Sequence, residues 1–151
     1  MISKKNLVIS TLSGLLLGLS FPPFNLGFLA WIFLIPLIHI YYSEACFKEK
    51  ILSFYTASFV SHAIITHWVA LNSGTSMQVA IFSYLALCIF YSFYWVLYLI
   101  FVHLSIKIKF FNRIEFLIWP LMWIIFEIIR SIGPLAAPWL NLSLSQSNYD
   151  R

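Results

Sequence analysis

The chain has 151 residues, of which 62% are hydrophobic and only 9% are charged. Soluble domains average about 45–50% apolar and about 25% charged residues, so this chain has too few charges to cover a water-soluble domain of its size. The composition excludes a soluble enzyme or a nucleic-acid-binding module and predicts an all-α, polytopic helical membrane protein. At about 20 apolar residues for each membrane-spanning helix, the length allows about five spans with short connections.

The first two predicted spans form a hairpin. Span one covers about residues 6–20 and ends before Pro22 and Pro23, because proline lacks the backbone N–H group and fixes φ. Span two covers about residues 26–42, so the two spans are antiparallel, and Asn25 lies with the two prolines in the turn between them. A further proline inside span two is expected to kink it. No small-residue cleavage site follows the first apolar run, which favours an uncleaved signal anchor.

Three more spans follow in chain order. Span three covers about residues 51–71 and leads into an uncharged turn at residues 72–76. Span four covers residues 77–106 and would be about 45 Å long as a helix, so we expect it to tilt or to protrude from the membrane. Span five covers residues 114–132. The segment after it, residues 133–151, contains one glycine and two prolines and cannot form one regular helix.

The positions of the basic residues predict the orientation. Seven of the nine lysines and arginines fall on one side of a five-span arrangement. They are Lys4, Lys5, Lys48, Lys50, Lys107, Lys109 and Arg113. The positive-inside rule assigns that side to the cytoplasm. We therefore expect a transmembrane region at residues 1–132 with a cytoplasmic N-terminus, and an irregular tail at residues 133–151 on the opposite face.

Glu127 and Arg130 are the strongest functional candidates. Residues three apart lie on the same face of a helix, and ionisable groups inside a span are costly and usually functional. One interpretation is an ion pair that stabilises the outer end of span five, and the other is a role in holding a lipid or a polar head group. Trp139 follows Pro138 in the tail and is a candidate for lipid contact, because indole rings favour the membrane interface.

Other small and polar residues are better explained by packing. His62 and His67 are separated by about 140° around a helix, so we expect no metal site and assign both to interhelical hydrogen bonds or to a polar cavity. Ser10, Gly14 and Gly18 form a small-xxx-small stripe that predicts a close helix contact. The sequence has no hydrolase, metalloprotease or nucleotide-binding motif, and it therefore predicts neither catalytic residues nor a cofactor.

Three segments of the chain carry a family resemblance. They are the hairpin from Gly18 to Gly27 with Ile35-Pro36-Leu37, the run His67-Trp68-Val69, and Trp123-x3-Glu127-x2-Arg130 followed by Ala137-Pro138-Trp139-Leu140 and Ser145-Gln146. In this order they resemble the N-terminal membrane region of apolipoprotein N-acyltransferase, a bacterial inner-membrane enzyme that completes lipoprotein maturation. Ala137 and Leu144 stand where the family more often has Phe and Tyr.

The resemblance implies transfer of an acyl chain from a phospholipid to a catalytic cysteine, and then to the amino group of a diacylglyceryl lipoprotein. The family's Glu-Lys-Cys triad belongs to a nitrilase-like periplasmic domain that these 151 residues do not contain. We therefore expect a truncated or split form that is inactive alone, with phospholipid, the lipoprotein and a separate catalytic-domain chain as partners. Glu127, Arg130, Pro138, Trp139 and Gln146 are the predicted lipid or substrate contacts.

Two alternative functions stay open. One is a non-enzymatic membrane protein that binds lipid or assists assembly. The other is a small membrane transporter, which would require charged residues near the middle of the membrane and an inverted repeat.

Overall fold

The computed structural model describes residues 2–108 and 114–147, and every regular element in these ranges is helical. The elements are α1 (Lys4–Ser20), η1 (Gly27–Trp31), α2 (Ile35–Tyr41), α3 (Phe47–Ile65), α4 (His67–Ala70), α5 (Met77–Ile106), α6 (Glu115–Arg130), η3 (Pro138–Leu140) and η4 (Leu142–Gln146). The all-α prediction is confirmed. Lys109 and Arg113 of the predicted cytoplasmic connection, and residues 148–151 of the predicted tail, lie outside the described residues.

Membrane-spanning character is clearest in α5. Among the helices in the described ranges, only α5 has both the length and the hydropathy expected of a span. It begins at the N-cap residue Ser76, whose hydroxyl accepts a hydrogen bond of 3.4 Å from the backbone N–H of Val79. The five-span arrangement stays a prediction.

Two predicted spans are interrupted. Instead of one kinked helix, span two consists of the short 3₁₀ helix η1 followed by α2, which carries Pro36 in its first turn. Proline is tolerated there because the first N–H groups of a helix have no intrahelical acceptor. Span three breaks at Thr66, between α3 and α4, where the Thr66 hydroxyl donates to the His62 carbonyl at 2.7 Å.

α1 and α3 pack closely through the predicted stripe of small residues. A Cβ atom on Gly14 would overlap the carbonyl oxygen of Ala57 and would lie 2.8 Å from the Cβ of Val60. A Cβ atom on Gly18 would lie 2.6 Å from the Cδ1 of Ile64. The stripe therefore faces α3, and its two glycines allow the backbones to approach.

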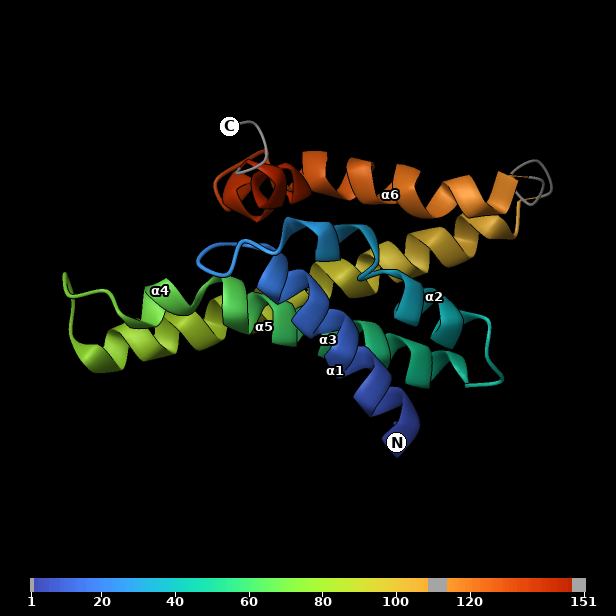
Figure 1. Ribbon diagram of the computed structural model, residues 1–151, viewed down its shortest axis with the longest axis horizontal. Helices are drawn as coiled ribbons and strands as arrows, with labels where there is room; N and C mark the ends of the chain where they lie inside the picture. The colour runs from blue at the N-terminus through green and yellow to red at the C-terminus, as the bar shows by residue number, and fades with distance from the viewer. Residues whose placement is uncertain (1, 109–113, 148–151) are drawn as a thin grey trace.

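A cluster of aromatic rings joins the segment between η1 and α2 to α5 and α6. The Phe33 ring lies 5.8 Å from that of Trp95 and 5.0 Å from that of Trp123, while Trp95 and Trp123 are 5.2 Å apart with nearly perpendicular planes. Edge-to-face pairs of this kind are the favoured geometry for aromatic rings. The cluster holds α6 alongside α5, and Figure 1 shows the tail after α6, in red, on the same side of the molecule as the turn after α1.

The N-terminus is attached to the start of α3. The Glu49 carboxylate accepts hydrogen bonds of 2.8 Å from the backbone N–H of Ser3 and from the side-chain amide of Asn6. These bonds stabilise the charged form, so the Ser3 and Asn6 donors lower the pKa of Glu49 from its ordinary value. The first residues of α1 and the first residues of α3 therefore share one end of the molecule, and the turn after α1 lies at the other.

Candidate functional site

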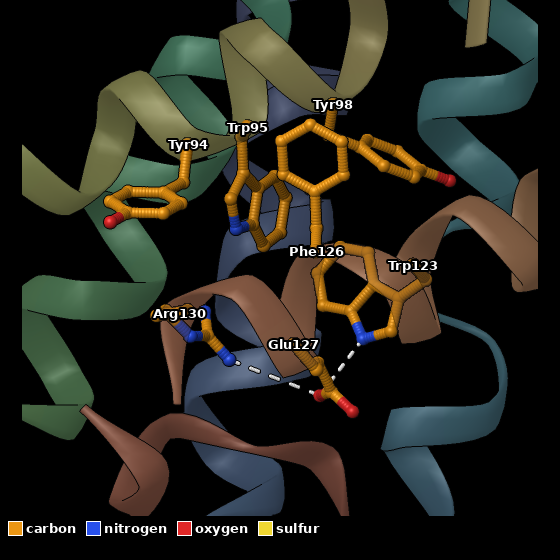
Figure 2. A pocket seen from close by; sticks show the side chains of 7 residues that line it. All are labelled: Tyr94, Trp95, Tyr98, Trp123, Phe126, Glu127 and Arg130. Atoms are coloured by element: carbon orange, nitrogen blue, oxygen red, sulfur yellow. Dashed lines mark hydrogen bonds and ion pairs between the residues drawn. The ribbon is translucent and has the colours of Figure 1, made fainter. Parts of the chain in front are cut away.

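Glu127 and Arg130 lie in the last turns of α6 and bind the tail that follows. Oε1 of Glu127 accepts hydrogen bonds from the indole Nε1 of Trp123 at 3.0 Å and from the backbone N–H of Leu142 at 2.6 Å. Nη2 of Arg130 donates to the Leu140 carbonyl at 2.7 Å and lies 3.9 Å from Oε1 of Glu127 (Figure 2). Arg130 is only 5% exposed, which is unusual for arginine unless it is paired.

Asn141 adds a second link between α6 and the tail. Its Nδ2 donates to the Ser131 hydroxyl at 2.9 Å, and its Oδ1 accepts from Nη2 of Arg130 at 3.4 Å. The backbone N–H of Ala137 donates to the Arg130 carbonyl at 2.8 Å, after the chain has turned at Gly133 with φ of 96°. Glycine is suited to this left-handed conformation because it has no Cβ. The tail therefore folds back onto the end of its own helix.

The tail also contacts the hairpin turn. Nε2 of Gln146 donates a hydrogen bond of 2.8 Å to the Gly27 carbonyl. Asn25 shapes this turn with a left-handed φ of 57°, and its Nδ2 donates to the Pro23 carbonyl at 3.3 Å. Asparagine is one of the few residues with a side chain that adopts this conformation readily.

A groove of about 320 Å³ lies where the turn, the end of α3 and the tail meet. Its lining is mainly apolar and consists of Phe21, Pro22, Ile65, Trp68, Trp139, Leu144 and Ser147. Trp68 is 54% exposed and Trp139 is 44% exposed, so both indoles reach the outer surface of the groove. The hydroxyl of Ser147 donates to the Leu144 carbonyl at 3.0 Å, and no titratable base lines the groove among the described residues. This lining suits binding of an apolar group.

A second groove of about 240 Å³ adjoins the same turn. It is lined by Pro23, Phe24, Ile64 and His67. Pro22 lines the first groove, which we call the Trp groove, and Pro23 lines the second, which we call the Phe groove. We refer to the pair as the outer grooves.

The structure gives the predicted site residues distinct positions. Trp139 lines the Trp groove, and Pro138 begins η3 directly before it. Glu127 and Arg130 do not line the outer grooves; they bind the backbone on either side of Asn141. Gln146 is bonded to Gly27 at the start of η1, directly after the hairpin turn. Sequence reasoning assigned no role to Asn141, whose link to Ser131 depends on a return of the chain that no local pattern indicates.

The two histidines of α3 and α4 bond to carbonyls within four residues of them, and not to a helix distant in the sequence. Nδ1 of His62 is 2.8 Å from the Ser58 carbonyl within the same helix, and its ring stacks on Tyr91 of α5 at 5.7 Å. Nδ1 of His67 is 2.8 Å from the Ile64 carbonyl, one turn earlier in the chain. A carbonyl three or four residues away is within reach of each ring in the helix itself. A partner on another helix comes within reach only when the two helices dock precisely. The described residues contain no group of three side chains placed to hold a metal ion.

A family model of the apolipoprotein N-acyltransferase N-terminal domain matches residues 13–150. The chain belongs to the apolipoprotein N-acyltransferase family. The matched range includes the hairpin, the His-Trp segment and the Trp-Glu-Arg segment with its tail, so the resemblance drawn from these motifs is confirmed. No curated protein and no solved structure matches the chain.

Proposed function

We propose that this chain is the membrane part of an apolipoprotein N-acyltransferase and that its outer grooves hold the acyl chains of a phospholipid. The proposal rests on the way in which distant segments of the chain meet at one groove. The hairpin turn, the segment after α3 and the tail are far apart in the sequence, yet they line one apolar groove in a chain of an acyltransferase family. These segments are also the ones that carry the family resemblance.

The orientation of the chain agrees with this proposal. Glu49 joins the lysine-rich N-terminus to the start of α3, whereas the outer grooves are built from the ends of α1 and α3. The positive-inside rule puts the lysine-rich end in the cytoplasm. In a five-span arrangement in the inner membrane, the outer grooves then open toward the periplasmic leaflet, and the half-exposed Trp68 and Trp139 lie at the level of the head groups.

The division into two grooves favours a lipid with two chains. The Trp groove of about 320 Å³ and the Phe groove of about 240 Å³ are both mainly apolar, and each is lined by one of the two adjacent prolines, Pro22 and Pro23. Small-molecule pockets have volumes of about 300–1,000 Å³, so each groove is near the lower limit of this range and suits part of one narrow alkyl chain. A diacyl phospholipid would place one chain in each groove.

Photo-crosslinking tests lipid binding directly. The purified chain is placed in nanodiscs with a phospholipid that carries a photoreactive group in one acyl chain, and the crosslinked residues are identified by mass spectrometry. We expect crosslinks at Trp68, Trp139 and Phe24 that decrease when unlabelled diacyl phospholipid is added. Phe82 on α5 is 76% exposed and serves as the control for unspecific contact with bulk lipid. Equal crosslinking at Phe82 and in the grooves would contradict the proposal.

A chimaera tests the link to acyl transfer. The chain replaces the corresponding region of a complete family member in cells, and mass spectrometry measures the third acyl chain on a lipoprotein. We expect transfer by the chimaera and a marked loss with Trp139→Ala. The control substitution is Phe82→Ala, which lies on the outward face of α5 and should leave transfer unchanged. Lipid crosslinking without any transfer would favour the alternative of a non-enzymatic lipid-binding protein.

A further inference from the structure

Three helices meet around His103, at the end of the molecule opposite the outer grooves. The hydroxyl of Tyr41, the last residue of α2, is 2.9 Å from Nδ1 of His103 near the end of α5. The ring of Phe47, the first residue of α3, lies 4.5 Å from the His103 ring. In Figure 1 this end is at the right, where α2 ends, α3 begins and α5 ends. We call this meeting point of the three helices the His103 junction.

Two lysines flank the His103 junction. Nζ of Lys50 lies over the Tyr41 ring, 5.3 Å from the ring centroid. Lys107 is the C-cap residue of α5 and follows His103 by four residues, a spacing that keeps side chains on one face of a helix. Both amino groups lie within electrostatic range of the His103 ring. The fold thus concentrates positive charge between the start of α3 and the end of α5.

Two carboxylates at the same end of the molecule are bonded to other groups. Glu49 accepts hydrogen bonds from the start of the chain, and Glu115 accepts one from the hydroxyl of Tyr42. Within the described ranges, neither Lys50 nor Lys107 forms an ion pair with a carboxylate. Like charges that the fold brings together repel, and the repulsion is stronger beside a membrane than in water because the dielectric constant is lower. A negatively charged group between α3 and α5 would remove this repulsion.

An exposed apolar track extends from Lys107 along α5. Leu104 lies three residues before Lys107 and Leu97 lies seven residues before Leu104, so the three side chains share one side of the helix. Both leucines are half-exposed. A soluble anion gains nothing from such a surface, whereas a phospholipid bound through its phosphate would lay an acyl chain on it. In a five-span arrangement, the positive-inside rule places this end in the cytoplasmic leaflet.

We propose that the His103 junction binds a phospholipid with a negatively charged head group in the cytoplasmic leaflet. The phosphate lies between Lys50 and Lys107, and an acyl chain follows the exposed track on α5. The lipid removes the repulsion between the lysines and so stabilises the contact of α2, α3 and α5. The outer grooves differ from this site because no lysine or arginine is among the described residues that line them. The inference does not depend on acyl transfer or on what the outer grooves bind.

Lipid titrations followed by native mass spectrometry test the proposal. The full chain in detergent is titrated with phosphatidylglycerol, which is anionic, and with phosphatidylcholine, which is zwitterionic and carries the same acyl chains. We expect several-fold tighter binding of phosphatidylglycerol, because the attraction of one lysine to an anionic lipid surface corresponds to about five-fold in affinity. Equal affinity for the two lipids would overturn the proposal.

Charge-matched variants locate the site. Lys50→Gln with Lys107→Gln should weaken the binding of phosphatidylglycerol at least about five-fold. The binding of phosphatidylcholine should stay unchanged, which also shows that the fold is intact. The control, Lys4→Gln with Lys48→Gln, removes the same charge from exposed positions and should keep the preference for the anionic lipid. Equal losses in the two double variants would show a response to overall charge and would overturn the proposal.

A soluble competitor distinguishes a lipid from a small phosphate compound. Glycerophosphoglycerol is the deacylated head group, with the same phosphate and without acyl chains. At a concentration equal to that of the lipid, it should not displace phosphatidylglycerol from the unmodified chain. Displacement at that concentration would assign the site to a soluble phosphate compound, and the proposed lipid site would be wrong. This measurement uses the unmodified chain, so it does not depend on the folding of a variant.

Discussion

The side-chain amide of Gln146 donates a hydrogen bond of 2.8 Å to the Gly27 carbonyl, across 119 residues of sequence. This bond attaches the end of the tail to the segment that follows the hairpin turn. The Trp groove lies between these two parts of the chain, so its shape depends on their remaining together.

Removing this bond is expected to loosen the tail. Gln146→Ala eliminates one partly buried hydrogen bond, which contributes about 0.5–1.5 kcal/mol. Hydrogen exchange measured by mass spectrometry should show faster exchange in residues 138–147 and no change in α3. The matched control is Ser143→Ala, an exposed position in the same 3₁₀ helix. Similar exchange in both variants would mean that Gln146 does not hold the tail.

The free energy of unfolding should depend on which residue replaces Glu127 in the buried pair at the end of α6. Glu127→Ala leaves Arg130 buried without its counter-charge, and breaking a buried ion pair in this way costs about 3–5 kcal/mol. Glu127→Gln keeps a carbonyl acceptor for the backbone N–H of Leu142 and should be milder. Equilibrium unfolding in detergent micelles measures both. A double variant, Glu127→Gln with Arg130→Met, should recover part of the loss because it leaves no buried charge.

The contact between α1 and α3 should not tolerate even a methyl group. Gly14→Ala directs a Cβ at the Ala57 carbonyl oxygen, which is backbone and cannot turn away. Gly18→Ala meets the Ile64 side chain, which can rotate in part. Overpacking typically costs about 1–3 kcal/mol, and we expect Gly14→Ala to be the more destabilising of the two in thermal unfolding. Gly74→Ala, in an exposed turn, is the control and should be nearly neutral.

The attachment of the N-terminus should depend on pH. Hydrogen bonds from Ser3 and Asn6 hold the pKa of Glu49 below its ordinary 4.5. A carboxylate with a lowered pKa contributes its full stabilisation above the ordinary value and loses it as the pH falls through the lowered one. A nitroxide label at Lys4 should therefore become more mobile in electron paramagnetic resonance spectra as the pH falls below 4.5.

A charge-neutral variant provides the comparison for this pH dependence. Glu49→Gln keeps an acceptor oxygen but does not titrate, so the label mobility should no longer change with pH. Glu44→Gln removes an exposed carboxylate that makes no hydrogen bond to the described residues at the start of the chain, and it should retain the change. A pH response that persists in Glu49→Gln would assign the effect to another group.

Local sequence patterns drew attention to several residues that the structure brings together. The prolines after α1 placed the hairpin turn, because proline cannot continue a helix. Glu127 and Arg130 were identified from their spacing, since residues three apart share a helix face. The break between η1 and α2 and the break at Thr66 were not foreseen, because the hydropathy of an apolar run is the same whether its helix is continuous or interrupted.

The sequence alone determined the helical class, the apolar character and the family, because these follow from composition and from motifs of adjacent residues. The burial of Arg130 and the outer grooves required the three-dimensional arrangement. The shortest hydrogen bonds of the Arg130 and Gln146 side chains go to backbone carbonyls, which every residue carries and which therefore leave no trace in a sequence. Only the return of the tail onto α6 and the hairpin turn brings those carbonyls within hydrogen-bonding distance.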